Sequence, residues 1–343
     1  MKTITLSFRD ALHLSNRRGD YGRSEGMIHS DTLHAAILDM WRWMGHIEWI
    51  DAHKDQFVCS SLFPVAGISE NEPVYFFPKP YFLAPGMQKS DDLEVKKLKK
   101  LQWLDWNIFR RWTQGVTFDF FPAYLRSEFA AEKWPATLEK KLPLERDVVP
   151  RAQVSRSEDD TTIYYVERLY FGPDCGLFGL IHADTNEIEA KCLAALRLLG
   201  DQGIGTDRNI GMGQFSLGER KDGFSNSNPN QGNFLLSLGL FCPEERAAFL
   251  EMIEGETPRY ELIQRGGWLG EPYNTYRKRS VQMLKEGSLL AHLPDKTKQI
   301  APGWYVMGKL WDLAPQQQYL PLDHPVTHPV YRSGKTLFYS VNL

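Results

Sequence analysis

Four glycines and one arginine give residues 203–215 the spacing of a binding loop. The glycines are Gly203, Gly205, Gly211 and Gly213, and Arg208 lies between them. A helical pattern precedes the loop and a strand pattern follows it, which reverses the strand–loop–helix order of dinucleotide-binding folds and P-loops. We therefore expect a loop whose exposed backbone N–H groups lie along a polyanion, with Arg208 projecting from its middle. The alternative is a loop whose glycines serve only tight turns that need positive φ.

The segment 9–29 is a second candidate, because it is long, polar and basic. Its residues suited to a nucleic acid are Asn16, Arg17, Arg18, Tyr21 and Arg23, interleaved with Gly19 and Gly22. Arginine supplies phosphate contacts, and a tyrosine ring can stack on an unpaired base. For the arginines the alternative is ordinary solvation of a loop, and for Tyr21 it is packing within that loop.

Bulk composition limits the classes of protein to which the chain can belong. Its 343 residues predict about two domains, and 42% hydrophobic residues suffice for real cores. A formal charge of −3 means that any nucleic-acid site is a local basic patch, which an acidic surface facing a protein partner could balance. The four cysteines are scattered, which argues against zinc and disulfides and suits a reducing cytoplasm. We expect a cytoplasmic protein, since no signal-peptide core and no membrane-spanning run occur.

The elements that must position these loops follow from periodicity. The first half begins with an alternating strand at Lys2–Phe8, a helix that starts at Ser30 or Asp31, and strands at Gln56–Phe63 and Pro73–Phe77. In the second half we predict strands at 175–182, 213–217, 233–241 and 259–263, with helices at 184–199 and 243–253. Residues 135–161 mix Pro, Lys, Glu and Asp and are typical of a linker.

This order predicts an α+β protein with two ferredoxin-like βαββαβ domains in tandem. The first spans residues 1–145 and carries inserted helices. The second spans residues 146–343, contains the Gly-rich loop 203–213 and ends in a C-terminal extension.

Short motifs along nearly the whole chain resemble those of a known family. They are Ile28-His-Ser-Asp-Thr-Leu33, Phe63-Pro64, Phe77-Pro-Lys-Pro80, Tyr276-Arg-Lys-Arg279, Glu286-Gly-Ser288 and His328-Pro-Val-Tyr-Arg332. With the Gly-rich loop after a helix, the fold is similar to the RAMP superfamily of CRISPR RNA-binding proteins. Within that superfamily the motifs, in this order, resemble subunit four of the type III-A Csm effector complex.

The resemblance implies a non-catalytic, RNA-binding subunit of a ribonucleoprotein for antiviral defence. In that family the subunit grips the repeat-derived 5′ handle of the CRISPR RNA (crRNA), docks the large polymerase/nuclease subunit and abuts the first backbone subunit. No cofactor and no metal are implied. We expect the first loop and the Gly-rich loop to hold the handle from two sides.

The RNA-binding residues that we predict lie in these loops and in three further places. Arg277 and Lys278 could contact RNA or a neighbouring subunit, and both options remain open. The full set is Arg17, Arg18, Tyr21, Arg23, His29, Ser30, Arg151, Arg156, Gly203, Gly205, Thr206, Asp207, Arg208, Asn209, Gly211, Gly213, Arg277 and Lys278.

A nuclease is the competing hypothesis. RAMP endoribonucleases that process crRNA precursors act without metal and use a histidine for general acid–base attack by the 2′-hydroxyl. The candidates for this histidine are His13, His29 and His34, and the alternative for each is a packed or surface histidine without a catalytic role. Asp31 at a helix start accepts N–H groups and complements the helix dipole, so we interpret it as structural and not catalytic. The sequence shows no metal-ligand constellation, and we expect no enzymatic activity.

Overall fold

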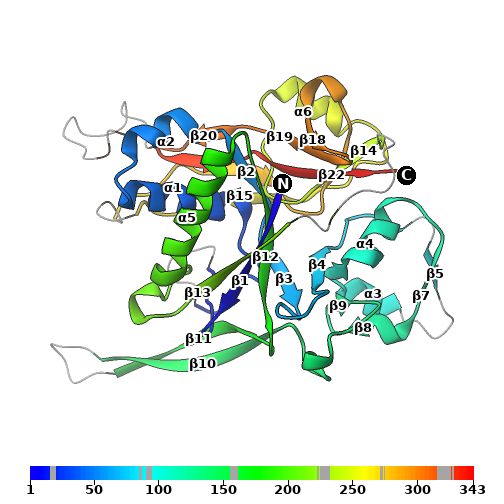
Figure 1. The fold of residues 1–343 in the computed structure, drawn as a ribbon, viewed down its shortest axis with the longest axis horizontal. Coiled ribbons are helices and arrows are strands. Elements are labelled where there is room, and N and C mark those ends of the chain that lie inside the picture. Colours follow the sequence, from blue (N-terminus) through cyan, green and yellow to red (C-terminus); the bar gives the residue numbers. More distant parts are fainter. Residues whose placement is uncertain are drawn as a thin grey trace.

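The structure contains two main sheets (Figure 1). It is a computed structural model that describes residues 1–15, 21–84, 87–89, 95–154, 161–221, 224, 232–270, 273, 275–314, 326 and 328–343. In this part of the chain, the larger sheet has nine strands and the smaller one five. The larger sheet contains, in order, β13 (Phe215–Lys221), β1 (Lys2–Phe8), β12 (Cys175–Ala183), β3 (Phe63–Ala66), β4 (Val74–Pro78), β6 (Trp103–Asp105), β9 (Phe129–Ala130) and β8 (Leu125–Arg126), while β2 (Phe57–Cys59) also pairs with β12. The smaller sheet contains, in order, β17 (Leu289–Ala291), β14 (Phe234–Ser237), β22 (Thr336–Val341), β19 (Trp304–Met307) and β18 (Lys298–Ala301). The predicted α+β class is confirmed.

The remaining elements surround these sheets. The helices are α1 (Ser30–Trp43), α2 (Ile47–His53), α3 (Val95–Lys100), α4 (Trp106–Thr113), α5 (Asn186–Gln202) and α6 (Arg246–Met252). Four strand pairs are separate: β5 (Met87–Lys89) with β7 (Phe118–Phe120), β10 (Leu144–Val154) with β11 (Thr161–Phe171), β15 (Leu262–Arg265) with β16 (Val281–Leu284), and β20 (Leu310–Asp312) with β21 (Tyr331–Ser333).

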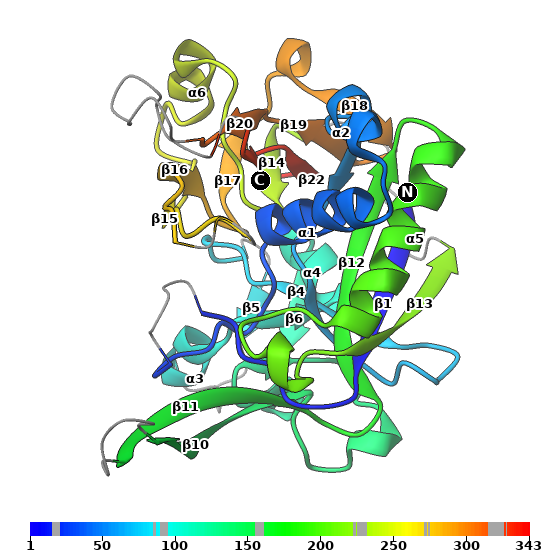
Figure 2. The same ribbon diagram turned by 90° about the vertical axis from the view of Figure 1, so that its left-hand side faces the viewer.

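One βαββαβ unit runs through the larger sheet. Antiparallel pairing places β1 between β12 and β13, so that Ile4 lies opposite Gly179 on one side and Glu219 on the other. Along the chain the unit consists of β1, α1, β2 with β3, β12, α5 and β13, and both helices cover the same face of the sheet (Figures 1 and 2). The indole N–H of Trp41 in α1 donates to the Lys191 carbonyl of α5 at 3.0 Å and so joins the helices.

This unit corrects the predicted domain organisation. The boundary expected between residues 145 and 146 falls inside β10, and the larger sheet takes strands from both sides of it. The expected second βαββαβ unit does not form, because β12 and β13 pair with β1, whereas β14 lies in the smaller sheet and β15 pairs with β16. An alternating pattern marks a strand without naming its partner, and an insertion of residues 67–174 separates the halves of the unit.

Residues 135–161 are not the predicted linker. Residues 144–154 of this segment form β10, which pairs with β11 over eleven residues each, from Leu144 opposite Phe171 to Val154 opposite Thr161. The hairpin runs along one end of the molecule (Figure 2). Most of its side chains are exposed, so no buried stripe marked these strands in the sequence.

The predicted helices are present, but their ends differ from the expectation. His29 is the N-cap residue of α1 and makes no side-chain cap, so neither Ser30 nor Asp31 caps this helix. In α5 the Thr185 hydroxyl accepts the capping hydrogen bond from Ile188 N at 3.2 Å. The helix continues past Gly200, which packs closely against Phe215 of β13, and ends at Gln202.

Aromatic packing around α4 joins the two sheets into one core. The Trp106 ring lies 5.2 Å from Phe77 of β4, 6.4 Å from Trp304 of β19 and 5.6 Å from Tyr339 of β22. A continuous apolar cluster therefore reaches from the larger sheet to the smaller one.

The loop between α5 and β13 needs glycine at three of its four glycine positions. Gly203, Gly205, Gly211 and Gly213 have φ values of 81°, 105°, 84° and 73°, a region that glycine adopts at little cost. A Cβ atom would lie 1.9 Å from the Ile204 carbonyl oxygen at Gly213, and 2.7 Å from a backbone carbonyl oxygen at Gly203 and at Gly205. A Cβ atom at Gly211 would meet nothing within 4 Å.

We expect Gly213→Ala to lower the free energy of unfolding by about 2–4 kcal/mol, because the left-handed backbone and the close carbonyl both penalise a methyl group. Gly211→Ala is the matched control. It carries only the backbone penalty of about 1–2 kcal/mol, since the space around it is open. Urea unfolding of both variants measures the difference, and equal losses would contradict the close packing at Gly213.

The buried His34 makes stability depend on pH. Burial lowers the pKa of its ring to about 4, although the Lys54 carbonyl, 2.9 Å from Nε2, favours the protonated form. Between pH 6.5 and 4 the unfolded chain therefore binds a proton that the folded chain does not, and stability falls as the pH is lowered through this window. The slope is at most about 1.4 kcal/mol per pH unit.

We expect His34→Gln to flatten this dependence, because glutamine can still donate to the Lys54 carbonyl but does not titrate. Urea unfolding at pH 7, 6, 5 and 4.5 compares the two proteins. The same slope in the variant would assign the pH dependence to other groups.

Candidate functional site

The centre of the Gly-rich loop is exposed, but part of its backbone is already bonded. Thr206, Arg208, Asn209 and Gly211 are exposed, whereas Gly203, Asp207 and Gly213 are buried. The N–H groups of Ile204, Thr206 and Met212 donate to the carbonyls of Gly213, His13 and Asp207 at 3.0, 3.1 and 3.3 Å. The expected row of free N–H groups is therefore wrong at these three positions, and the side chains at 206–209 remain available for a ligand.

The segment around Tyr21 lies against the β10–β11 hairpin and against His13, whose carbonyl accepts from Thr206 of the Gly-rich loop. The Tyr21 ring is 37% exposed and lies 6.0 Å from the His13 ring and 5.3 Å from Tyr164 of β11. Its carbonyl accepts from the backbone N–H of Glu167 at 2.8 Å. Arg23 is exposed beside it. Arg17, Arg18 and Arg156, which we also predicted to bind RNA, lie outside the described residues.

An ion-pair group fastens the Gly-rich loop to the β10–β11 hairpin. Asp207 Oδ2 lies 3.1 Å from the Arg151 guanidinium and 3.6 Å from that of Arg168. Two predicted residues, Arg151 and Asp207, are thus brought together, with intrachain partners. Sequence reasoning missed Arg168 and Tyr164, although Tyr164, Val166 and Arg168 alternate along one face of β11.

We call the exposed group Tyr21, Arg23, Thr206, Arg208 and Asn209 the loop surface. The first loop, the Gly-rich loop and the hairpin meet there, as the contacts between His13, Gly205, Asp207 and Arg151 show. Two of its five side chains are exposed arginines, in a chain whose formal charge is −3. Such a surface suits a strand that carries phosphates and unpaired bases.

A second polar group connects α1 to the C-terminal part of the chain. Asp31 is fully buried and accepts from Arg265 of β15, with Nε–Oδ2 and Nη2–Oδ1 distances of 3.0 and 3.1 Å, and from Arg332 of β21. Burial alone would raise the pKa of Asp31, but the two guanidinium groups outweigh it and hold this pKa well below its usual range. The carboxylate is therefore a structural ion-pair partner, which agrees with the non-catalytic role expected for it.

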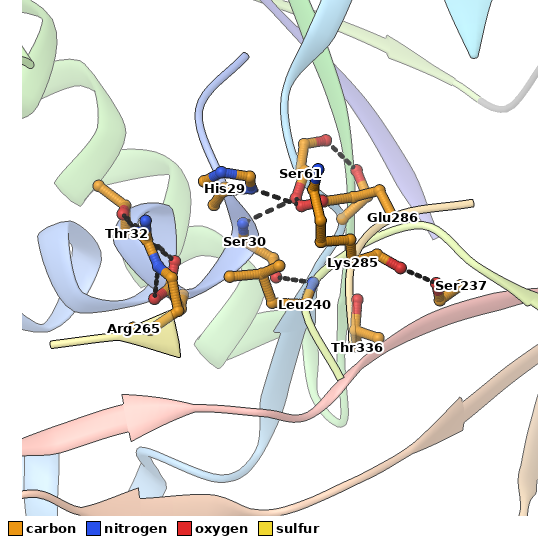
Figure 3. A network of polar contacts seen from close by, with 12 residues as sticks. His29, Ser30, Thr32, Ser61, Ser237, Leu240, Arg265, Lys285, Glu286 and Thr336 are labelled. Carbon is orange, nitrogen blue, oxygen red and sulfur yellow. Dashed lines mark hydrogen bonds and ion pairs between the residues drawn. The ribbon is translucent and has the colours of Figure 1, made fainter. Parts of the chain in front are cut away.

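His29 and Ser30 belong to an adjoining buried network (Figure 3). The imidazole Nδ1 of His29 lies 2.8 Å from Glu286 Oε1, and the Ser61 hydroxyl donates to the same oxygen. Ser30 donates its backbone N–H to Ser61 Oγ at 2.8 Å and accepts from the Leu240 N–H at 2.9 Å. Both residues were predicted to bind RNA, and the structure instead gives them buried partners within the chain.

Four of the short motifs therefore converge on one place. The motifs at 28–33, 286–288 and 328–332 contribute Asp31, Glu286 and Arg332 to this group of contacts, and Lys278 of the motif at 276–279 lies within its electrostatic range. Of the two predicted cations, Lys278 is half-buried near Arg265 and Arg332, whereas Arg277 is exposed with its guanidinium 4.8 Å from the Trp268 ring.

The three histidines do not form a catalytic group. His13, His29 and His34 are all buried, and their ring nitrogens contact the Glu167 carbonyl, the Glu286 carboxylate and the Lys54 carbonyl. In the described ranges, no cluster of three or more His, Cys, Asp or Glu residues could hold a metal ion. Nor does any helix within those ranges have the length and apolar character to cross a membrane.

Comparison with known proteins gives three findings. Residues 230–341 match the family model of the CRISPR Csm4 C-terminal domain. The "CRISPR system Cms protein Csm4" of Thermococcus onnurineus (strain NA1) is 24% identical over 320 residues, which cover 89% of this chain and 92% of that protein.

Solved structures share the fold over the whole chain. A Csm4-containing structure titled as the Csm3–Csm4 subcomplex in the type III-A CRISPR-Cas interference complex matches with a TM-score of 0.61 at 17% identity, and covers all of both chains. A Csm1–Csm4 cassette in complex with pppApA matches with a TM-score of 0.59 at 18% identity, and covers 100% of this chain and 98% of the other. The C-terminal part of the chain thus matches the Csm4 C-terminal domain family, most of the chain is similar in sequence to a Csm4 protein, and the whole chain shares the fold of Csm4-containing structures, which all agrees with the resemblance carried by the short motifs.

Proposed function

We propose that this chain binds the repeat-derived 5′ handle of crRNA in a type III-A interference complex, as a non-catalytic subunit in antiviral defence. The observation that carries the proposal is the loop surface, where two segments far apart in sequence, both in contact with the β10–β11 hairpin, present exposed arginines and a tyrosine ring. Arg23 and Arg208 supply phosphate contacts, and Tyr21 supplies a ring on which an unpaired base stacks.

The architecture of the loop surface supports a fixed register for the strand. Positive φ at the glycines and the Asp207 ion pairs hold the Gly-rich loop in one conformation against the hairpin. A preformed surface loses less conformational freedom when it binds a short strand than a mobile loop would.

We also propose that the chain docks the large polymerase/nuclease subunit and the adjacent backbone subunit. The related solved structures are titled as Csm1–Csm4 and Csm3–Csm4 assemblies. Several apolar side chains of this chain are exposed, as is common at protein interfaces. They are Trp43 at the end of α1, Ile47 at the start of α2, and Ile163 and Tyr165 on β11.

The alternative, a metal-independent RAMP endoribonuclease that processes crRNA precursors, has less support. It needs a histidine within reach of the RNA 2′-hydroxyl. The three candidate histidines are buried and bonded within the chain, and His29 in particular is held by Glu286.

We expect Arg208→Glu to weaken binding of handle RNA about tenfold or more, because the change removes one phosphate contact and adds a repelling charge. The slope of log affinity against log salt should become flatter by about 0.7. Filter binding at several salt concentrations measures both effects.

Arg246→Glu is the matched control, since Arg246 is an exposed arginine of α6, far from the loop surface, and its reversal changes the net charge equally (Figure 1). Equal losses in both variants would indicate non-specific attraction. Unchanged affinity in Arg208→Glu would remove Arg208 from the site.

We expect the pure protein to leave repeat RNA intact in EDTA, Mg²⁺ or Mn²⁺, because His13, His29 and His34 are buried and the described residues hold no cluster suited to a metal ion. Gel analysis of end-labelled RNA tests this. Cleavage at one site of the repeat that His29→Ala abolishes would establish the nuclease instead, whereas cleavage insensitive to the mutation would indicate a contaminant.

A further inference from the structure

A buried aspartate lies within the loop surface, where its charge opposes the binding of a polyanion. Asp207 stands between Thr206 and Arg208, and its carboxylate contacts two arginines of the β10–β11 hairpin. The contact with Arg151 is bidentate, since the Nη2–Oδ2 and Nη1–Oδ1 distances are 3.1 and 3.4 Å. Arg168 Nη2 lies 3.6 Å from the same Oδ2. Two guanidinium groups therefore share one carboxylate.

Backbone hydrogen bonds shape the turn around Asp207. The Asp207 carbonyl accepts from the N–H groups of Ile210 and Met212 at 3.2 and 3.3 Å. The N–H of Thr206 donates to the His13 carbonyl at 3.1 Å. A neutral side chain at position 207 would keep all three bonds. The charge of Asp207 therefore has a role other than forming the turn.

The acidic residues next to the two arginines on the hairpin are bonded elsewhere. Asp147 lies opposite Arg168 in the register of the two strands, but its Oδ1 accepts from the next backbone N–H at 2.8 Å. Glu167 precedes Arg168 on β11, and its Oε2 accepts from the N–H of Ser24 at 2.7 Å. Within the described ranges, Arg168 Nε is buried and has no hydrogen-bond partner. The carboxylate that the structure places against both arginines is that of Asp207.

This carboxylate takes the place that a phosphate would need. A guanidinium binds phosphate and carboxylate groups in the same bidentate geometry. The Arg151 side chain is 22% exposed, so a strand on the loop surface could reach it in the absence of Asp207. While Asp207 is in place, both the geometry and the negative charge keep a phosphate away from Arg151 and Arg168.

We propose that Asp207 determines specificity for the crRNA handle by withholding Arg151 and Arg168 from strands that offer phosphates alone. The proposal rests on the proposed RNA-binding function and deepens it, because it names a residue that acts against other RNA. Specific binding sites often include such an element that disfavours the wrong partner.

The two kinds of RNA differ in how much they would gain from the withheld arginines. The handle is held in one register by the exposed side chains of the loop surface, and in that register the Asp207 pairs stay intact. An unrelated strand has no preferred register and binds wherever cations meet its phosphates, since phosphate contacts carry no sequence information. Two further available arginines would therefore favour unrelated RNA more than the handle.

Filter binding of the full chain tests this with handle RNA and with a scrambled RNA of the same length and composition. Asp207→Asn removes the charge and keeps the shape of the side chain. It should bind the scrambled RNA about five- to tenfold more tightly, with a log–log salt slope steeper by about 0.7 for each arginine that gains a phosphate. Its affinity for handle RNA should stay within about threefold, so the ratio of the two affinities should fall.

Asp201→Asn is the matched control. Asp201 is an exposed aspartate near the end of α5, two residues before Gly203, and its substitution changes the net charge equally. The control should leave the ratio of affinities unchanged. Arg151→Gln, added to Asp207→Asn, should remove most of the gain for scrambled RNA, and persistence of the full gain would contradict the role of Arg151.

A second measurement does not depend on the folding of an Asp207 variant. Arg151→Gln alone should bind scrambled RNA within about threefold of the wild type, because Asp207 already withholds this arginine. A loss of about tenfold would show that Arg151 contacts phosphate in the wild type, and would overturn the proposal.

The remaining outcomes separate this proposal from the proposed function. Equal changes in the affinity of Asp207→Asn for both RNAs, in either direction, would make Asp207 a general charge or a brace of the loop and not a specificity residue. Equal affinity of the wild type for both RNAs would also overturn the proposal, while RNA binding itself would stand. Failure of the wild type to bind either RNA would reject the proposed function.

Discussion

The arrangement of α1 against the C-terminal part of the chain depends on the buried ion pairs between Asp31, Arg265 and Arg332. A carboxylate with no solvent exposure is tolerable only when it is fully paired, and both partners come from the C-terminal part of the chain. Removal of one partner of such a buried pair typically costs about 3–5 kcal/mol. The first turn of α1 therefore fixes β15 and β21, two strands that lie outside both large sheets. The neighbouring network of His29, Ser61 and Glu286 adds directional bonds at the same contact.

Periodicity in the sequence predicted individual elements well and their partners poorly. The strand at Lys2–Phe8 and the helices α1, α5 and α6 form close to the predicted ranges. The pairing of β1 with β12 and β13 was not predicted, since alternation records which face of a strand is buried and not which strand lies beside it. The β10–β11 hairpin was missed because a two-stranded ribbon with most side chains in solvent has no buried stripe.

The candidate site shows the same limit at the level of single residues. The glycines have the positive φ values that we gave as the alternative to a binding loop, and their spacing did not show that internal carbonyls would occupy several of the N–H groups. Asp207 was predicted as an RNA contact, and its pairing with Arg151 and Arg168 depends on a hairpin that the sequence did not reveal. The motifs that carry the family resemblance were identified one by one. Their convergence on Asp31 joins residues as far apart as 301 positions, which no local pattern records.

The insertion of residues 67–174 delays the pairing of β1 while the chain is being synthesised. Ala66 and Cys175 lie opposite each other in paired strands, so the insertion, which adds β4, β6, β8 and β9 to the larger sheet, begins and ends at neighbouring points. Until β12 is made, the partners of β1 in the sheet do not exist, and at about 5–20 residues per second this wait is on the order of ten to forty seconds. During that time the apolar faces of α1 and β1 are exposed. Asp31 remains unpaired with Arg332 for longer, because Arg332 is synthesised after β12. The N-terminal half of the chain thus reaches its final form only when the C-terminal end has emerged, and until then its exposed apolar surface favours aggregation.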